Sequence, residues 1–361
     1  MQLYDEGLYE ALRADKSTVS LRGLKINVKA IPDEKQAGYL DPRELALLQN
    51  RVPEPMPEGL PAIEKMRRSM GFPNRNMNTV EIHTKFEAHT FGGNPVNFWI
   101  YTPRKPEDKQ DRPALFYIHG GGWVGGSPYT VENPCKLIAE RADCVVINVE
   151  YSLAPEKPFP NGFNDCWAAL KYLHVHADAY GIDPNRIGVG GDSAGGNLAA
   201  VCAMIDRDLG TNIIKYQALI YPLVTFMTHK TPGYKWNIDR YEIAEPFKEI
   251  LEPALTGMAM QDEDSQVFSA YLRGRMDDAR SVYASPMLFE KAGMAKTLMV
   301  SAEYCGLRVQ DEIFAAQLNK AGVDVRCIRY KGVMHAFFDK LGYLPQAESL
   351  VQDIAEDIIK M

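Results

Sequence analysis

From Leu115 onward, short apolar runs alternate with longer amphipathic stretches along the chain. Short apolar runs favour β-strands, and amphipathic stretches of helical period favour α-helices. The alternation therefore predicts an α/β fold in which helical crossovers join the strands of a mainly parallel sheet. The expected strands are residues 114–119, 145–149, 187–189, 218–221, 297–301 and 325–330, with 96–101 as an antiparallel strand before them. The expected helices are residues 134–142, 164–176, 194–208 and 313–321.

Two regions break this alternation. Residues 1–75 contain helical patterns that prolines interrupt, and residues 225–283 are rich in methionine, tyrosine and acidic residues. The second region is far longer than a crossover between two strands needs. We expect both regions to form one helical cap over an end of the sheet. The expected division is a cap segment at 1–75, a first core part at 76–224, a cap insertion at 225–283 and a second core part at 284–361.

Composition and charge argue against several classes of protein for this chain. The net charge of −7 is modest and its charges are interleaved, so the basic stripe of a nucleic-acid-binding protein is missing. No apolar stretch approaches the length of a membrane span, and the first residues lack the pattern of a secretory signal. The six cysteines do not have the spacing of a metal site. We expect a cytoplasmic protein with reduced thiols; whether it forms a homodimer stays open.

A serine stands in the segment Gly191-Asp192-Ser193-Ala194-Gly195. An apolar run precedes this G-x-S-x-G pattern and a helical pattern follows it. A strand-to-helix turn this tight strains the backbone at the serine, and flanking glycines leave room for the turn. The alternative is a glycine-rich turn with a helix-capping serine. The order of strand, turn and helix favours Ser193 as a nucleophile.

A second glycine-rich segment, His119-Gly120-Gly121-Gly122-Trp123, follows an earlier strand. Consecutive glycines expose backbone N–H groups to a ligand. The alternatives are a mobile turn or a phosphate-binding loop, but a phosphate loop needs a Lys-Ser/Thr pair after its glycines. We expect the N–H groups of Gly120, Gly121 and Gly122, with that of Ala194, to stabilise the oxyanion of a tetrahedral acyl intermediate. We expect His119 to be structural.

A serine nucleophile needs a base, most often histidine. Among seven histidines, His335 follows the expected strand 325–330 after a short loop containing Gly332. It also comes late in the chain, in keeping with the order Ser, acid, His of this class of site. His335 is therefore the expected base.

Three segments together resemble the hormone-sensitive-lipase-like family of α/β-hydrolases: residues 119–123, residues 191–197 and residues 330–337. Further matches are Tyr151-Ser152-Leu153-Ala154-Pro155-Glu156, Phe159-Pro160, Asp165 and Ser285-Pro286. The resemblance covers roughly residues 95–340. It implies the α/β-hydrolase fold with a helical cap, hydrolysis of carboxylic esters by an esterase or lipase, and no metal or organic cofactor.

The chain departs from the family where the family places its triad aspartate, because Cys305 stands there. A neutral thiol is a weak donor and a weaker acceptor, so it would orient and stabilise the histidine poorly. Glu303, two residues upstream, is the nearest substitute, although we rank a structural role for it higher. Other carboxylates that remain open are Asp311, Glu242 and Glu245. A second departure is Ser152 where the family usually has arginine, which leaves the expected partner of Glu156 in question.

The sequence predicts a serine carboxylesterase whose substrate is a small or medium apolar ester. The alternative is a catalytically weakened α/β-hydrolase that acts as a ligand-binding protein or receptor, and only Cys305 supports it. The cap contains apolar and aromatic candidates for the substrate site, although at helical spacing such residues more often form core. They are Tyr234, Trp236, Tyr241, Phe247, Met258, Met260, Phe268 and Tyr271.

Overall fold

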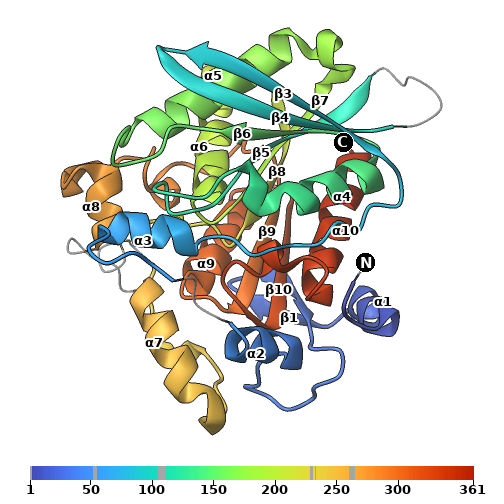
Figure 1. Ribbon diagram of the computed structural model, residues 1–361, viewed down its shortest axis with the longest axis vertical. Helices are drawn as coiled ribbons and strands as arrows, with labels where there is room; N and C mark the ends of the chain where they lie inside the picture. The colour runs from blue at the N-terminus through green and yellow to red at the C-terminus, as the bar shows by residue number, and fades with distance from the viewer. Residues whose placement is uncertain (1, 52–54, 105–110, 228–230, 232, 260–264) are drawn as a thin grey trace.

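The computed structural model describes residues 2–51, 55–104, 111–227, 231, 233–259 and 265–361 (Figure 1). The described strands form one ten-stranded sheet in the order β1-β2-β10-β9-β8-β7-β5-β6-β4-β3. Their bounds are β1 Thr18–Leu21, β2 Leu24–Lys29, β3 Ile82–Phe91, β4 Asn94–Pro103, β5 Arg112–Ile118, β6 Val145–Glu150, β7 Ile182–Asp192, β8 Ile214–Ile220, β9 Lys296–Tyr304 and β10 Val325–Met334. Pairing is parallel from β2 through β10, β9, β8, β7 and β5 to β6, and antiparallel at both ends.

Helices cover both faces of this sheet. Their bounds are α1 Glu6–Ala14, α2 Pro42–Gln49, α3 Ala62–Ser69, α4 Glu132–Ala142, α5 Asn161–Val175, α6 Ala194–Leu209, α7 Lys248–Ala259, α8 Gln266–Leu272, α9 Arg308–Lys320 and α10 Pro345–Ile359. Helices α4 and α10 pack against each other on one face, with α1 beside α10, and α5 packs against α6 on the other. Right-handed crossovers dictate this division, because the chain moves along the sheet in one direction from β6 to β10. The predicted α/β fold is confirmed.

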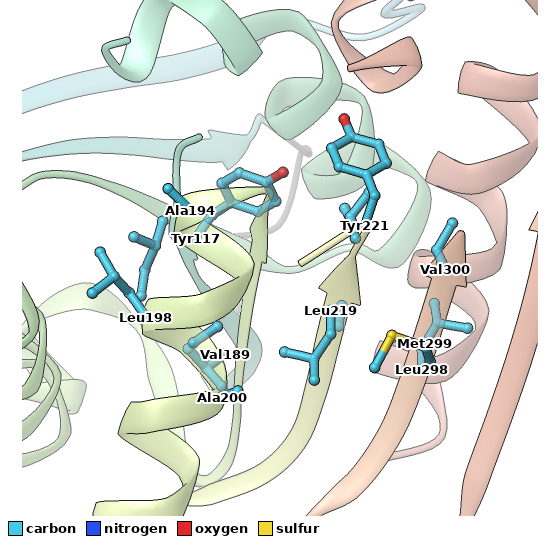
Figure 2. Close-up of a cluster of buried hydrophobic side chains, with 14 of the residues drawn as sticks. Tyr117, Val189, Ala194, Leu198, Ala200, Leu219, Tyr221, Leu298, Met299 and Val300 are labelled. Atoms are coloured by element: carbon cyan, nitrogen blue, oxygen red, sulfur yellow. The ribbon is translucent and has the colours of Figure 1, made fainter. Parts of the chain in front are cut away.

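The buried hydrophobic core extends over both faces of the sheet, and Figure 2 shows the part of it between the central strands and α6. Val189 of β7, Leu219 of β8 and Leu198 of α6 are fully buried there. Strands buried on both faces read as continuous apolar runs, which is why the sequence pattern locates them. Tyr117 and Tyr221 lie at the carboxyl ends of their strands, the end at which ligands bind in open parallel sheets.

The N-terminal region differs in part from the expectation of a helical cap. Residues 18–29 form β1 and β2, and β2 pairs in parallel with β10 through Ile26 and Cys327. Without β2, the edge of β10 would expose unpaired backbone groups. Helix α3 of this region does contact α8 of the 225–283 region. The first region thus extends the sheet and also contributes helices that meet the second.

The described residues contain neither a membrane-spanning helix nor a cluster of metal ligands. None of the helices that the structure describes combines the length and the apolar character needed to cross a bilayer. Over the same residues, no group of three or more histidine, cysteine or acidic side chains is arranged to hold a metal ion.

Candidate active site

Ser193 lies at the turn between the last residue of β7 and the first residue of α6. Its backbone has φ 54° and ψ −117°, in a region that L-residues with a side chain rarely adopt. Such a conformation persists only where the surrounding structure enforces it. Here the Ser193 N–H donates to the carbonyl of Ile220 at 2.9 Å, which ties the turn to β8.

Close packing of β5, β7 and α6 explains the glycines on either side of Ser193. A Cβ atom on Gly195 would lie 2.0 Å from the carbonyl oxygen of Ile118. A Cβ atom on Gly191 would lie 2.5 Å from the carbonyl carbon of Gly195. A side chain at either position would push the helix away from the sheet. The glycines therefore hold the serine in its strained turn.

The segment of three glycines lines the same cavity as Ser193 and His335. Gly121 and Gly122 have φ of 127° and 60°, and a Cβ atom on Gly121 would lie 2.1 Å from the carbonyl oxygen of Gly125. Ala194 begins α6, so its N–H has no partner within the helix. The N–H of Gly120 instead donates to Oδ1 of Asp192 at 3.0 Å. Of the four backbone N–H groups expected to bind an oxyanion, those of Gly121, Gly122 and Ala194 are therefore still available to do so.

His335 directly follows β10 and reaches the serine. Its Nε2 lies 2.9 Å from Oγ of Ser193, within the range of a hydrogen bond. The Tyr221 ring packs against the imidazole with 4.7 Å between the ring centroids. The nucleophile and the base predicted from sequence are therefore brought together, 142 positions apart in the chain.

Cys305 contacts the ring nitrogen of His335 that does not face Ser193. Its Sγ lies 3.1 Å from Nδ1 of His335, and the side chain is fully buried. The N–H of Leu307, just before α9, points at the same sulfur at 3.4 Å. The structure thus places a thiol where a triad carboxylate would accept the Nδ1–H of the histidine.

Glu303 faces away from this contact. Its carboxylate accepts the N–H of Gly332 at 2.8 Å and lies 3.5 Å from Nζ of Lys331. These contacts lie where the pairing of β10 with β9 shifts register, between Tyr330 and Met334. Glu303 therefore supports the irregular end of β10 that leads to His335.

The other candidate carboxylates also lie elsewhere. Glu242 and Glu245 have exposed side chains, and Glu245 pairs with Lys248 at 2.6 Å. Asp311 is fully buried in the first turn of α9, and neither of its carboxylate oxygens has a hydrogen-bond partner among the described residues. For none of the three does the structure show a contact with the histidine.

Comparison with known proteins gives a consistent answer. A family model described as an α/β-hydrolase fold matches residues 115–339. Arylacetamide deacetylase of Bos taurus is 30% identical over 327 residues, which covers 76% of this chain and 80% of the relative. Esterase LipI of Mycobacterium tuberculosis is 32% identical over 255 residues, covering 70% and 74%. The chain belongs to the hormone-sensitive-lipase-like family of α/β-hydrolases.

Solved structures agree with this assignment. The carboxylesterase EstE1, cloned from a metagenomic library, aligns with a TM-score of 0.67 at 31% identity and covers 78% of this hydrolase and 90% of that chain. An esterase of Pyrobaculum calidifontis aligns with a TM-score of 0.67 at 34% identity, covering 83% and 89%. This hydrolase is therefore a carboxylic ester hydrolase.

Burial dominates the electrostatics of this hydrolase. Burial, with a smaller contribution from nearby Lys340, lowers the pKa of His335 from 6.5 to about 4. Burial also raises the pKa of the Cys305 thiol. A thiol that stays protonated supplies no negative charge to stabilise the imidazolium. The histidine is therefore neutral at pH 7 and acquires a proton with difficulty.

This electrostatic state predicts an unusually acidic limit of activity. A general base must be unprotonated, so a lowered His335 pKa preserves the active form down to about pH 4. We expect kcat/KM to stay level from pH 7 to about pH 5 and to fall below that. The measurement is kcat/KM from pH 3.5 to 8, with circular dichroism at each pH as a check of folding. A fall centred near pH 6.5 in a folded chain would contradict the lowered pKa.

Asp192 is a site residue that sequence reasoning did not single out. Its buried carboxylate accepts the Tyr117 hydroxyl and the N–H of Gly120, both at 3.0 Å. Burial raises the pKa of Asp192 to about 6. The residue between Gly191 and Ser193 therefore connects the nucleophile turn to the three-glycine segment. The only signal in the sequence is its place within G-x-S-x-G.

Arg67 of α3 provides the partner that the sequence left in question for Glu156. Its guanidinium donates to both carboxylate oxygens of Glu156, at 2.9 and 2.6 Å. It also donates to the backbone carbonyls of Val124 and Ala154. With serine at position 152, an arginine from the N-terminal region thus joins the three-glycine segment to the segment around Glu156. Arg67 and Glu156 are 89 positions apart, so no local sequence pattern could predict this ion pair.

The cavity in front of Ser193 has a volume of about 460 Å³. Of the apolar cap residues expected from the sequence, Met258 and Phe268 line it. The others of that set that the structure describes pack away from the cavity, and Met260 lies outside the described residues. The N-terminal region supplies the lining that sequence reasoning missed: Leu48, Met66, Met70 and Phe72. Irregular, proline-interrupted segments carry little periodicity from which such positions could be inferred.

Proposed function

We propose that this hydrolase cleaves small or medium apolar carboxylic esters through an acyl-enzyme on Ser193, with Cys305 in place of the triad acid. The observation that carries the proposal is the 2.9 Å contact between Ser193 Oγ and His335 Nε2 inside a mostly apolar cavity. Helices α2, α3, α7 and α8 each contribute side chains that line this cavity, which supports a cap over the site. The lining of methionine, leucine and phenylalanine supports an apolar acyl or alcohol group.

The reaction proceeds in two steps on this geometry. Ser193 Oγ attacks the ester carbonyl carbon while His335 Nε2 takes its proton, and the N–H groups of Gly121, Gly122 and Ala194 stabilise the oxyanion. The C–O bond to the alcohol then breaks, and the alcohol leaves with the proton from His335. Water, deprotonated by His335, attacks the acyl carbon in the same way and releases the acid and free Ser193.

The test is hydrolysis of p-nitrophenyl acetate and butyrate by the purified chain. We expect measurable turnover of the short esters, whose acyl groups fit readily in a cavity of about 460 Å³. A small excess of an organophosphonate ester should abolish turnover. Ser193 Oγ displaces the leaving group of the reagent, so the peptide that contains Ser193 should gain the mass of the phosphonyl group less one hydrogen. Absence of turnover and of labelling would contradict the proposal.

A second candidate function is ligand binding by a catalytically weakened hydrolase. It is favoured by one observation, the neutral thiol beside His335 Nδ1. A binding site has no need, however, of a strained serine, free oxyanion donors and a histidine in hydrogen-bond reach together. Slow but serine-dependent turnover supports the esterase; phosphonate binding that is reversible and unchanged in Ser193→Ala supports the binding protein.

The geometry of Gly121 allows a test of the oxyanion donors. Alanine at this position would place Cβ 2.1 Å from the Gly125 carbonyl oxygen, so the loop would have to move. Losing one donor typically lowers kcat by about 10²–10³. We expect Gly121→Ala to lower kcat within that range while KM changes little. Gly92→Ala is the matched control, because Gly92 also has a positive φ but its Cβ would meet no atom within 4 Å. An unchanged kcat in Gly121→Ala would exclude the donors from the reaction.

A further inference from the structure

The Cys305 thiol lies between two groups that compete for its single hydrogen. On one side is His335 Nδ1, 3.1 Å from Sγ. On the other is the thioether sulfur of Met258, 3.8 Å from Sγ and within reach of an S–H donor. A thiol donates one hydrogen bond and accepts weakly through its sulfur. The direction of the S–H bond therefore decides which role the thiol has toward the histidine.

The two directions have opposite consequences for Ser193. When the S–H points at Nδ1, that nitrogen is the acceptor, so the neutral ring carries its hydrogen on Nε2. Nε2 then faces Ser193 Oγ with a hydrogen and cannot take a proton from it. When the S–H points away, the sulfur accepts Nδ1–H and Nε2 presents a lone pair to the serine. A carboxylate has no hydrogen and would enforce the second arrangement unaided.

We propose that Met258 is a positioning residue that draws the Cys305 S–H away from His335 and thereby keeps the histidine in the tautomer that can deprotonate Ser193. This inference rests on the proposed function and adds to it a residue of the cap. Met258 acts through the thiol, because Cys305 Sγ is within hydrogen-bond reach of both Met258 and His335, and no hydrogen bond links these two residues directly.

The surrounding structure holds Met258 close to the thiol. Gly306 follows Cys305 and lies against α7, where a Cβ atom would be 2.6 Å from the Leu255 carbonyl oxygen and 2.9 Å from Cβ of Met258. The Tyr241 hydroxyl donates to the Cys305 carbonyl at 2.8 Å. The absence of a side chain at residue 306 thus allows α7 to approach the loop, and Met258 is brought to the sulfur.

The test is the tautomer of His335 in Met258→Leu, a variant that keeps the apolar volume and removes the sulfur acceptor. Imidazole ¹⁵N chemical shifts of the histidine-labelled chain report which nitrogen carries the hydrogen, and His335→Gln identifies the His335 signals. We expect the native ring to carry hydrogen mainly on Nδ1 and the Met258→Leu ring to shift toward Nε2. Because a hydrogen bond from a thiol to a thioether is weak, we expect kcat of Met258→Leu to be only about two- to fivefold lower than that of the native chain.

Two matched controls separate this role from a packing role. Met66→Leu changes another methionine that lines the cavity, and we expect the His335 tautomer to stay as it is in the native chain. In the Cys305→Asp background, Met258→Leu should leave the tautomer unchanged, because a carboxylate accepts Nδ1–H without help. If Met258→Leu does not fold, Met258→Ile provides the same test.

Three results would overturn the inference: a native ring that carries its hydrogen on Nε2, a tautomer ratio that is the same in native and Met258→Leu chains, or an equal shift in Met66→Leu. The ¹⁵N readout needs no turnover. A chain that hydrolyses no ester would therefore defeat the proposed function while the role of Met258 is still decided by the spectra.

Discussion

Replacing Cys305 with aspartate is expected to raise kcat for p-nitrophenyl butyrate by about 10²–10⁴. In a serine protease, an amide in place of the triad aspartate lowers turnover by about 10⁴, and a buried neutral thiol leaves the imidazolium similarly unsupported. A carboxylate at this position, where Sγ now lies 3.1 Å from Nδ1, is expected to reverse that deficit. It also raises the His335 pKa, because a nearby negative charge favours the imidazolium, so the acidic limit of activity should move to higher pH.

The position of Cys305 already suits a carboxylate. It lies just before α9, whose N-terminal end favours negative charge, and the Leu307 N–H points at Sγ. Arg308, the first residue of α9, adds a positive charge nearby. We therefore expect the aspartate variant to fold with a thermal midpoint near that of the native chain.

Cys305→Asn is the matched control for the charge. An amide has nearly the same shape as the aspartate but no charge, so we expect its kcat to stay within about tenfold of the native value. Steady-state kinetics of the three chains at pH 7.5 distinguish the outcomes. Equal turnover of the aspartate and native chains would show that another group already performs the role of the acid.

Ser193→Ala is expected to have an effect whose size depends on residue 305. In a serine protease, removing the whole triad lowers kcat by about 2 × 10⁶, while removing its aspartate alone costs about 3 × 10⁴. If the Cys305 thiol contributes little to catalysis, the contribution of Ser193 to kcat in the native chain is the ratio of these two factors, about 10². We expect Ser193→Ala to lower kcat by about 10² in the native chain and by about 10⁶ in the Cys305→Asp chain.

The measurement is a double-mutant comparison of native, Ser193→Ala, Cys305→Asp and the combined variant. Both serine variants should also lose any pre-steady-state burst of p-nitrophenol. Alanine accepts the φ of 54° about as well as serine, so thermal unfolding should be nearly unchanged. Turnover that survives Ser193→Ala in both backgrounds would remove Ser193 from the mechanism.

The sequence predicts correctly those parts of the fold that are determined by residues close together in the chain. The central strands read as apolar runs because both of their faces are buried. The turn at Ser193 is readable because Gly191 and Gly195 meet backbone atoms at distances that allow no side chain. A β-strand, a glycine turn and a helix in sequence determine where that serine lies.

Long-range contacts account for what sequence reasoning missed. Strands β1 and β2 are short and partly exposed, and only their pairing with β10 shows that they belong to the sheet. Arg67 meets Glu156 from a distant helix. Met258 lies beside Cys305 because Gly306 admits α7, and a methionine in an irregular cap has no pattern that would indicate this contact.

The most direct test of the central claim is a crystal structure of the chain after reaction with a small phosphonate ester, whose tetrahedral phosphorus resembles the acyl intermediate. The proposed mechanism predicts a bond from phosphorus to Ser193 Oγ and a phosphoryl oxygen within about 3.1 Å of the N atoms of at least two of Gly121, Gly122 and Ala194. His335 Nε2 should remain within hydrogen-bond reach of the adduct. A phosphonate attached to another residue, or a phosphoryl oxygen that points away from all three N–H groups, would contradict it.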